Sequence, residues 1–124
     1  MSYPLFLGED SPELALVLRE AAVDNWDGEG ARRIPVEAAL KALALLRLLS
    51  GHGIPKPELV ASRTGSIALD WDGGPRWVFA ISVGSSDQVS YAGLFDRDRI
   101  HGQETILTRL PKTLLAAFDR FLRR

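Results

Sequence analysis

Four side chains are spaced so that they could form a small acid–base site. Asp70 and Asp72 stand two residues apart in an alternating segment, which places both carboxylates on one side of a strand, about 7 Å apart. His101 and Glu104 lie further along the chain near other acids, and an imidazole beside carboxylates can act as a general base. One such histidine with scattered carboxylates falls short of a transition-metal centre. The four residues define a candidate site for a small hydrolase or ligand-binding domain, with no metal or cofactor assigned.

The usual signatures of covalent and phosphate chemistry are missing from the sequence. There is no cysteine, which excludes a thiol nucleophile, a disulfide framework and a cysteine-based zinc site. No serine stands in a Gly-x-Ser-x-Gly turn. Gly28-x-Gly30 follows a predicted helix, whereas a phosphate-binding loop follows a strand and opens a helix. The sequence therefore favours a non-enzymatic protein.

Residues 24–31, Asp-Asn-Trp-Asp-Gly-Glu-Gly-Ala, form an unusual segment that we call the corner. Its two glycines indicate positive φ or a close backbone approach, and the Asn25 and Asp27 side chains can hydrogen-bond nearby main chain. Trp26 is expected to pack its ring into the core and to find an acceptor for its indole N–H. Two interpretations stay open: a folded-down structural turn, or a recognition loop. In the second, Asn25, Trp26, Asp27 and Glu29 contact a partner, and the two carboxylates face a basic surface.

Hydrophobic periodicity predicts three helices. The stretch Asp10-Ser-Pro-Glu13 has the capping side chain and early proline of a helix start, with Asp10 as the cap. A second helix is expected from Pro35 to about Ser50, and its nearly all-round apolar character indicates cover on several sides. The last helix is expected to begin at Pro111.

Between the second and third helices the hydrophobic period changes to two, which predicts strands. Asp72-Gly73-Gly74 is a strong hairpin signal. The expected strands cover residues 59–63, 67–72, 77–83, 89–93 and 99–103. Two N-terminal helices, an antiparallel meander of four to five strands and a C-terminal helix make an α+β fold, in one domain over residues 1–124.

One face of the predicted sheet is made of small and modest apolar side chains, while the bulky residues point the other way. This small-residue face comprises Ala68, Val78, Ala80, Ser82, Ser90, Ala92 and Leu94. Such a smooth surface can be covered by a helix of the same chain, or by another protein, including a second copy in a homodimer. The sequence leaves both open.

Composition is that of an ordinary globular protein, with 46% hydrophobic and 25% charged residues. The N-terminus lacks the pattern of a signal peptide, and the apolar run 36–49 is too short to span a bilayer, so a cytoplasmic protein without membrane contact is expected. Residues 1–30 hold seven acids against one arginine, while residues 97–124 hold seven basic residues against three acids. Those basic residues are not interleaved with aromatics, so a nucleic-acid partner is not favoured.

The corner and the meander together resemble an uncharacterised family of small bacterial and phage-encoded proteins. The resemblance rests on Asn25-Trp-Asp-Gly-x-Gly-Ala31, a Pro55-x-Pro57 connector, Ile67-Ala-Leu-x-Trp71, Ser90-Tyr-Ala-Gly93 and His101-Gly102. It covers roughly residues 20–105. It implies a shared fold and a shared reason for the corner, and it brings no activity, substrate or cofactor.

The leading hypothesis is a non-enzymatic protein-binding module in bacterial conflict or regulation: an immunity protein, an antitoxin or a phage-encoded inhibitor. Its support is the scarcity of catalytic groups, the small size and the uneven charge. The alternative is the hydrolase or ligand-binding domain described above. The two differ in whether the acid–base residues meet in one concave pocket.

Overall fold

A computed structural model describes residues 11–106 and 108–124, and within these ranges the chain forms three helices and five strands. The helices are α2 (Pro12–Glu20), α3 (Val36–Gly51) and α4 (Lys112–Leu122). The strands are β1 (Glu58–Ala61), β2 (Ile67–Asp72), β3 (Trp77–Val83), β4 (Gln88–Phe95) and β5 (Asp98–Thr105). Two helices, a run of strands and a final helix make an α+β fold, as the sequence predicts.

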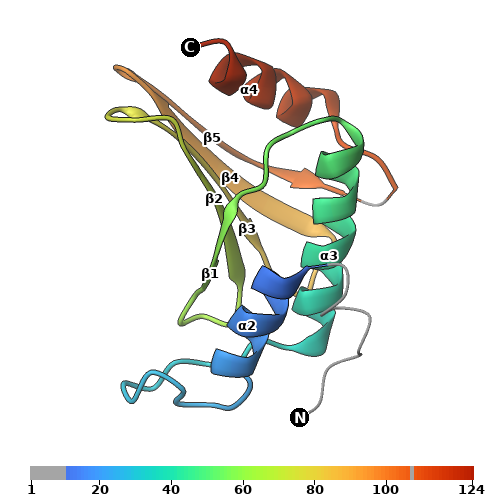
Figure 1. The fold of residues 1–124 in the computed structure, drawn as a ribbon, viewed down its shortest axis with the longest axis vertical. Helices are drawn as coiled ribbons and strands as arrows, with labels where there is room; N and C mark the ends of the chain where they lie inside the picture. Colours follow the sequence, from blue (N-terminus) through green and yellow to red (C-terminus); the bar gives the residue numbers. More distant parts are fainter. Residues whose placement is uncertain (1–10, 107) are drawn as a thin grey trace.

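The five strands form one antiparallel sheet in which each strand pairs with its neighbours in the sequence, in the order β1-β2-β3-β4-β5. β1 and β5 are therefore the two edges. The helices lie on one side of the sheet: α3 and α4 pack against it, and α2 lies beside α3 near β1 (Figure 1). We call the sheet face against the helices the inner face and the opposite one the outer face.

The helices begin where the local sequence provides a cap or a proline. The Ser11 hydroxyl accepts a hydrogen bond from the Leu14 N–H at 3.2 Å, so Ser11 caps α2. The predicted cap, Asp10, lies outside the described residues, and its neighbour takes that role. Pro35 and Pro111 directly precede α3 and α4 and pre-set the backbone of each helix entry. No helix in the described ranges combines the length and apolar character needed to cross a bilayer.

The inner face carries the bulky side chains, and its centre is aromatic. Phe118 of α4 is 1% exposed and contacts Trp71 of β2 and Phe79 of β3 edge to face, each with ring centroids 4.8 Å apart. This arrangement suits the quadrupoles of the rings. Phe118 thus fixes α4 to the middle of the sheet.

Two tryptophan indoles at this core form hydrogen bonds to the backbone of neighbouring segments. Trp71 donates its indole N–H to the Pro55 carbonyl at 2.7 Å, in the connector between α3 and β1. Trp77 donates to the Phe121 carbonyl of α4, also at 2.7 Å. Each bond gives a buried donor its partner and holds a chain segment in place.

The strand boundaries match the expected ones in the centre of the sheet and differ at its edges. β2 and β3 have the predicted bounds. β1 ends at Ala61 rather than at residue 63, because the chain turns at Ser62, whose N–H donates to the Ser66 carbonyl at 2.8 Å. β4 and β5 are longer than predicted, since residues 96 and 97 alone turn the chain, with Asp96 at a φ of 59°.

Candidate functional site

The corner is a turn that the Asp27 side chain stabilises through contacts inside the corner and with Arg63. One carboxylate oxygen accepts hydrogen bonds from the Glu29 N–H at 2.8 Å and the Ala31 N–H at 3.0 Å. The other lies 2.7 Å from Nε of Arg63, in the turn between β1 and β2. The Glu29 N–H, helped by the Ala31 N–H and Arg63, holds the pKa of Asp27 below its usual 3.8 against the opposing effect of burial. With its side chain 17% exposed, Asp27 uses its carboxylate for contacts within the chain and so stabilises the corner.

Asn25 and Trp26 also serve the corner itself. Asn25 adopts a φ of 63°, and its side-chain oxygen accepts a hydrogen bond from the Gly30 N–H at 2.7 Å. Trp26 donates its indole N–H to the Arg32 carbonyl at 2.9 Å, which confirms the expected acceptor. Its ring is only half-buried and packs against the margin of the core instead of plugging it. Of the four predicted contact residues, Asn25 and Glu29 are exposed, and contact of this segment with a partner stays a prediction.

The four residues of the predicted acid–base site do not converge. Asp70 and Asp72 lie on the outer face of β2, and His101 lies on the outer face of β5. β3 and β4 stand between them, so Asp70 and His101 are roughly 14 Å apart by strand spacing. Glu104 lies on the inner face, where its carboxylate accepts a hydrogen bond from the Thr113 hydroxyl. Within the described part of the chain, no three His, Asp or Glu residues gather where a metal ion could sit.

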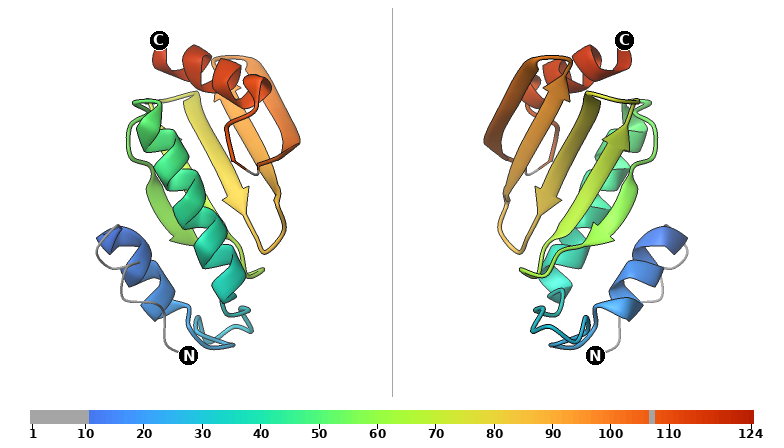
Figure 2. Two further views of the ribbon diagram at one scale, coloured as in Figure 1. Left: turned by 90° about the vertical axis from the view of Figure 1, so that its right-hand side faces the viewer. Right: turned by 90° about the vertical axis from the view of Figure 1, so that its left-hand side faces the viewer.

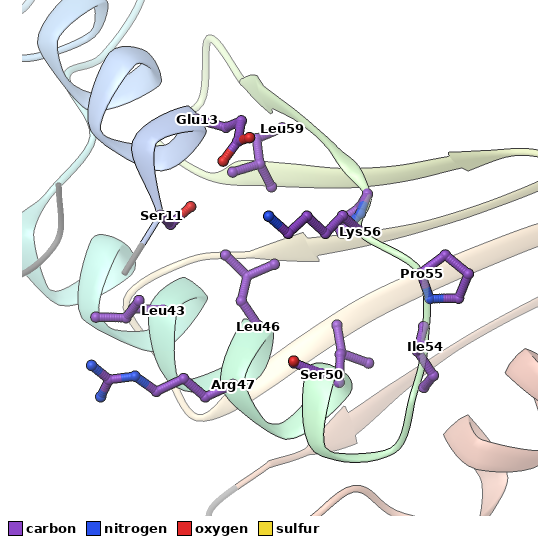
Figure 3. A pocket seen from close by; sticks show the side chains of 12 residues that line it. Ser11, Glu13, Leu43, Leu46, Arg47, Ser50, Ile54, Pro55, Lys56 and Leu59 are labelled. Carbon is purple, nitrogen blue, oxygen red and sulfur yellow. The ribbon is translucent and has the colours of Figure 1, made fainter. Parts of the chain in front are cut away.

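A pocket of about 310 Å³ lies between α2, the second half of α3 and the connector to β1 (Figure 3). Leu46 and Leu59 are among its apolar walls, and Arg47 and Lys56 bring charges to its lining. Ser11 also lines it, but its hydroxyl already caps α2. None of the lining residues is a histidine. The pocket has apolar walls with three charged residues in its lining, Glu13, Arg47 and Lys56, and it holds no histidine base paired with a nucleophile.

The outer face of the sheet has no described helix over it (Figure 2, right). The small-residue face lies on this side, because its members alternate with the buried residues of β2, β3 and β4. Strand register arranges the outer face in three rows that run across the sheet towards β5. The first row is Glu58, Asp70, Ala80, Ala92 and His101, and the second row is Val60, Ala68, Ser82, Ser90 and Gln103. The third row starts at β2 and is Asp72, Val78, Leu94 and Arg99. The outer face is a smooth surface five strands wide.

The outer face is charged at its two edges, with opposite signs. Glu58 of β1 pairs with Asp70 of β2, and this acidic edge lies across the sheet from Arg99 of β5, whose guanidinium supplies the positive charge. Burial, together with the Glu58 charge, raises the pKa of the Asp70 carboxyl above its usual 3.8. The ionised Asp70 carboxylate therefore lowers the stability of the folded monomer. The charge of the outer face therefore changes from negative at the β1 edge, through a neutral centre, to positive at the β5 edge.

The sequence predicts the centre of the outer face but not its edges. The rows are completed by Glu58 and Val60 of β1 and by Arg99 and Gln103 of β5. His101 also lies on this face, away from the acids with which the sequence groups it. The signal that could have found these edge residues is the same period-two alternation, continued through both edge strands.

No protein-family model matches the chain, and searches of curated proteins and of solved structures also find no match. The resemblance to the family of small bacterial and phage-encoded proteins therefore stays a prediction, and function is argued from the geometry of this chain.

Proposed function

We propose that this protein is a non-enzymatic protein-binding module that uses the outer face of its sheet as the contact surface. The observation that carries the proposal is the contrast between the two faces. The inner face is bulky and sits under helices, while the outer face is small, smooth and free of any described helix. Exposed apolar side chains gathered on one face are typical of an interaction surface.

The apolar side chains of the outer face are accessible in the monomer. Val60 is 42% exposed and Val78 is 39% exposed, and both belong to rows with alanine, serine or leucine neighbours. The sheet presents such groups with little ordering cost, because the strands already fix their backbone. The surrounding charges of Asp72 and Arg99 would form a polar rim, as at other protein interfaces.

The separation of His101 from Glu104 and from the two aspartates supports binding over catalysis. A general base must reach the group from which it takes a proton. These side chains lie on different faces or are several strands apart. The expected roles in bacterial conflict or regulation, as an immunity protein, an antitoxin or an inhibitor, would all be served by contact with another protein.

Photo-crosslinking at two matched positions tests the proposal. Val78 on the outer face and Leu40 on α3 are both aliphatic and are 39% and 41% exposed. A photoreactive amino acid at position 78, irradiated in an extract of the native host, should give defined protein adducts. The same residue at position 40 should not.

Arginine substitutions at the same two positions give a quantitative test. Each variant's affinity is measured for the protein that is captured at position 78. Val78→Arg should weaken its binding at least about tenfold, because the charge would have to be desolvated in the contact. Leu40→Arg should leave the affinity unchanged. Equal adduct patterns at the two positions, or equal affinities of the two variants, would contradict the proposal.

A further inference from the structure

We propose that the outer face pairs with the outer face of a second copy of this chain, about a two-fold axis that runs parallel to the strands. This inference rests on the proposed function and names the partner. It follows from the charge pattern on the outer face, because one orientation of a face-to-face pair sets the acidic edge of each copy against the edge of the other that carries Arg99.

A two-fold axis parallel to the strands turns each sheet over from side to side. The β1 edge of one copy then faces the β5 edge of the other, and each row of the outer face lies against the same row of its partner. In the first row, Glu58 faces His101 of the second copy and Ala80 faces Ala80. Because the symmetry repeats every contact, the acidic and basic edges meet twice.

The other in-plane orientation brings like charges together. An axis perpendicular to the strands would set β1 against β1 and β5 against β5. Glu58 and Asp70 would then meet their own copies, although burial and the Glu58 charge already raise the pKa of Asp70 within one chain. Like charges placed opposite each other across an interface are unfavourable. Electrostatics therefore selects the axis parallel to the strands.

The centre of the outer face suits close approach of two sheets. Ala68, Ala80, Ala92, Ser82 and Ser90 occupy the middle of the rows, so few atoms stand between the two backbones. Sheets that pack face to face keep their strands within about 30° of each other, which the parallel axis provides. The result would be four layers, with the helices outside and two sheets inside.

The size of the surface indicates a dimer of modest strength. Five strands spaced about 4.8 Å apart, each with some 20 Å of length, give roughly 500 Å² per copy and about 1,000 Å² for the pair. That is the lower limit of specific interfaces, where weak and reversible association is found. Dimerisation should therefore depend on concentration between about 10 μM and 1 mM.

A charge swap tests the pairing. In analytical ultracentrifugation at low salt, Glu58→Lys and His101→Glu should each weaken the dimer about tenfold. Glu58→Lys places an ammonium group near Arg99 of the second copy, and His101→Glu places a carboxylate opposite Glu58, in both symmetry-related contacts. The double variant Glu58→Lys/His101→Glu should recover wild-type association within about threefold. The two positions are roughly 19 Å apart in one chain, so a recovery can only come from contact between copies. Glu37→Lys, at an exposed acid on α3, is the control for net charge and should leave the dimer unchanged.

Engineered cysteines test the orientation, and the absence of native cysteine makes the readout clean. Val60 and Gln103 end the second row at opposite edges and carry no charge. A mixture of Val60→Cys and Gln103→Cys chains should form a disulfide under mild oxidation, while Val60→Cys alone should not. Efficient crosslinking of Val60→Cys alone would overturn the proposed axis.

Failure of this inference can be told apart from failure of the proposed function. A wild-type chain that stays monomeric at about 1 mM would overturn the dimer. If the photoreactive residue at position 78 still captures another protein, the binding module stands with a different partner. Adducts absent at position 78, together with a monomer, would remove both. A double charge variant no better than the worse single variant would also refute the pairing.

Discussion

Replacement of Phe118 by alanine should be one of the costlier changes to the stability of this protein. Its ring is 1% exposed and makes two edge-to-face contacts at 4.8 Å, so no neighbour can easily fill the space that it leaves. Truncation of a buried phenylalanine costs about 3–5 kcal/mol. A chain of 124 residues has a total stability of roughly 6–19 kcal/mol, so the variant should remain folded at 25 °C.

Urea unfolding followed by circular dichroism measures this cost. The midpoint should fall for Phe118→Ala, and the melting temperature should drop by about 10–20 °C. Leu122→Ala is the matched control, because Leu122 lies on the same helix and is 50% exposed; it should cost less than about 0.5 kcal/mol. A Phe118→Ala cost below about 1.5 kcal/mol, or one equal to that of the control, would refute the view that this ring anchors α4.

Two further predictions concern acids with shifted pKa values. Because the Glu29 N–H lowers the pKa of Asp27 below 3.8 in the folded state, the wild type should be more stable than Asp27→Asn at neutral pH. That advantage should be complete above about pH 5 and vanish as the pH falls below 3.8, in thermal melts across pH; a pH-independent difference would contradict it. Burial and Glu58 raise the pKa of Asp70, so Asp70→Asn should stabilise the monomer at pH 7, and the gain should shrink as the pH falls towards 3.8. Melts at low protein concentration check this, and a destabilised Asp70→Asn monomer would show that the carboxylate has a favourable partner.

The central strands could be predicted from the sequence because local chemistry fixes them. Residues 67–72 and 77–83 alternate strictly, and the glycines between them allow a tight turn. The start of α2 and the end of β1 differ from the prediction because single local hydrogen bonds decide them. The Ser11 hydroxyl caps α2, and the backbone N–H of Ser62 donates to the Ser66 carbonyl and closes the turn that follows β1.

The candidate site could be predicted only in part, because it depends on contacts between distant segments. Alternation separates small from bulky faces but does not tell on which face the helices lie. The opposition of Glu58 to His101 needs four successive strand registers, and a slip by one residue in any of them would turn one side chain away. The corner was ambiguous for the same reason, since the partner of Asp27 is Arg63, in a different turn.

The three indole hydrogen bonds give the protein a set of built-in optical probes. Trp26 lies in the corner and donates its indole N–H to the carbonyl of Arg32, directly after it. Trp71 donates to the connector before β1, and Trp77 donates to the end of α4, so each indole reports on a different segment. Two Trp→Phe substitutions would leave a single emitter, whose spectrum shifts to longer wavelength when water reaches its segment. Intrinsic emission can therefore distinguish local opening at three separate places from global unfolding, without any attached label.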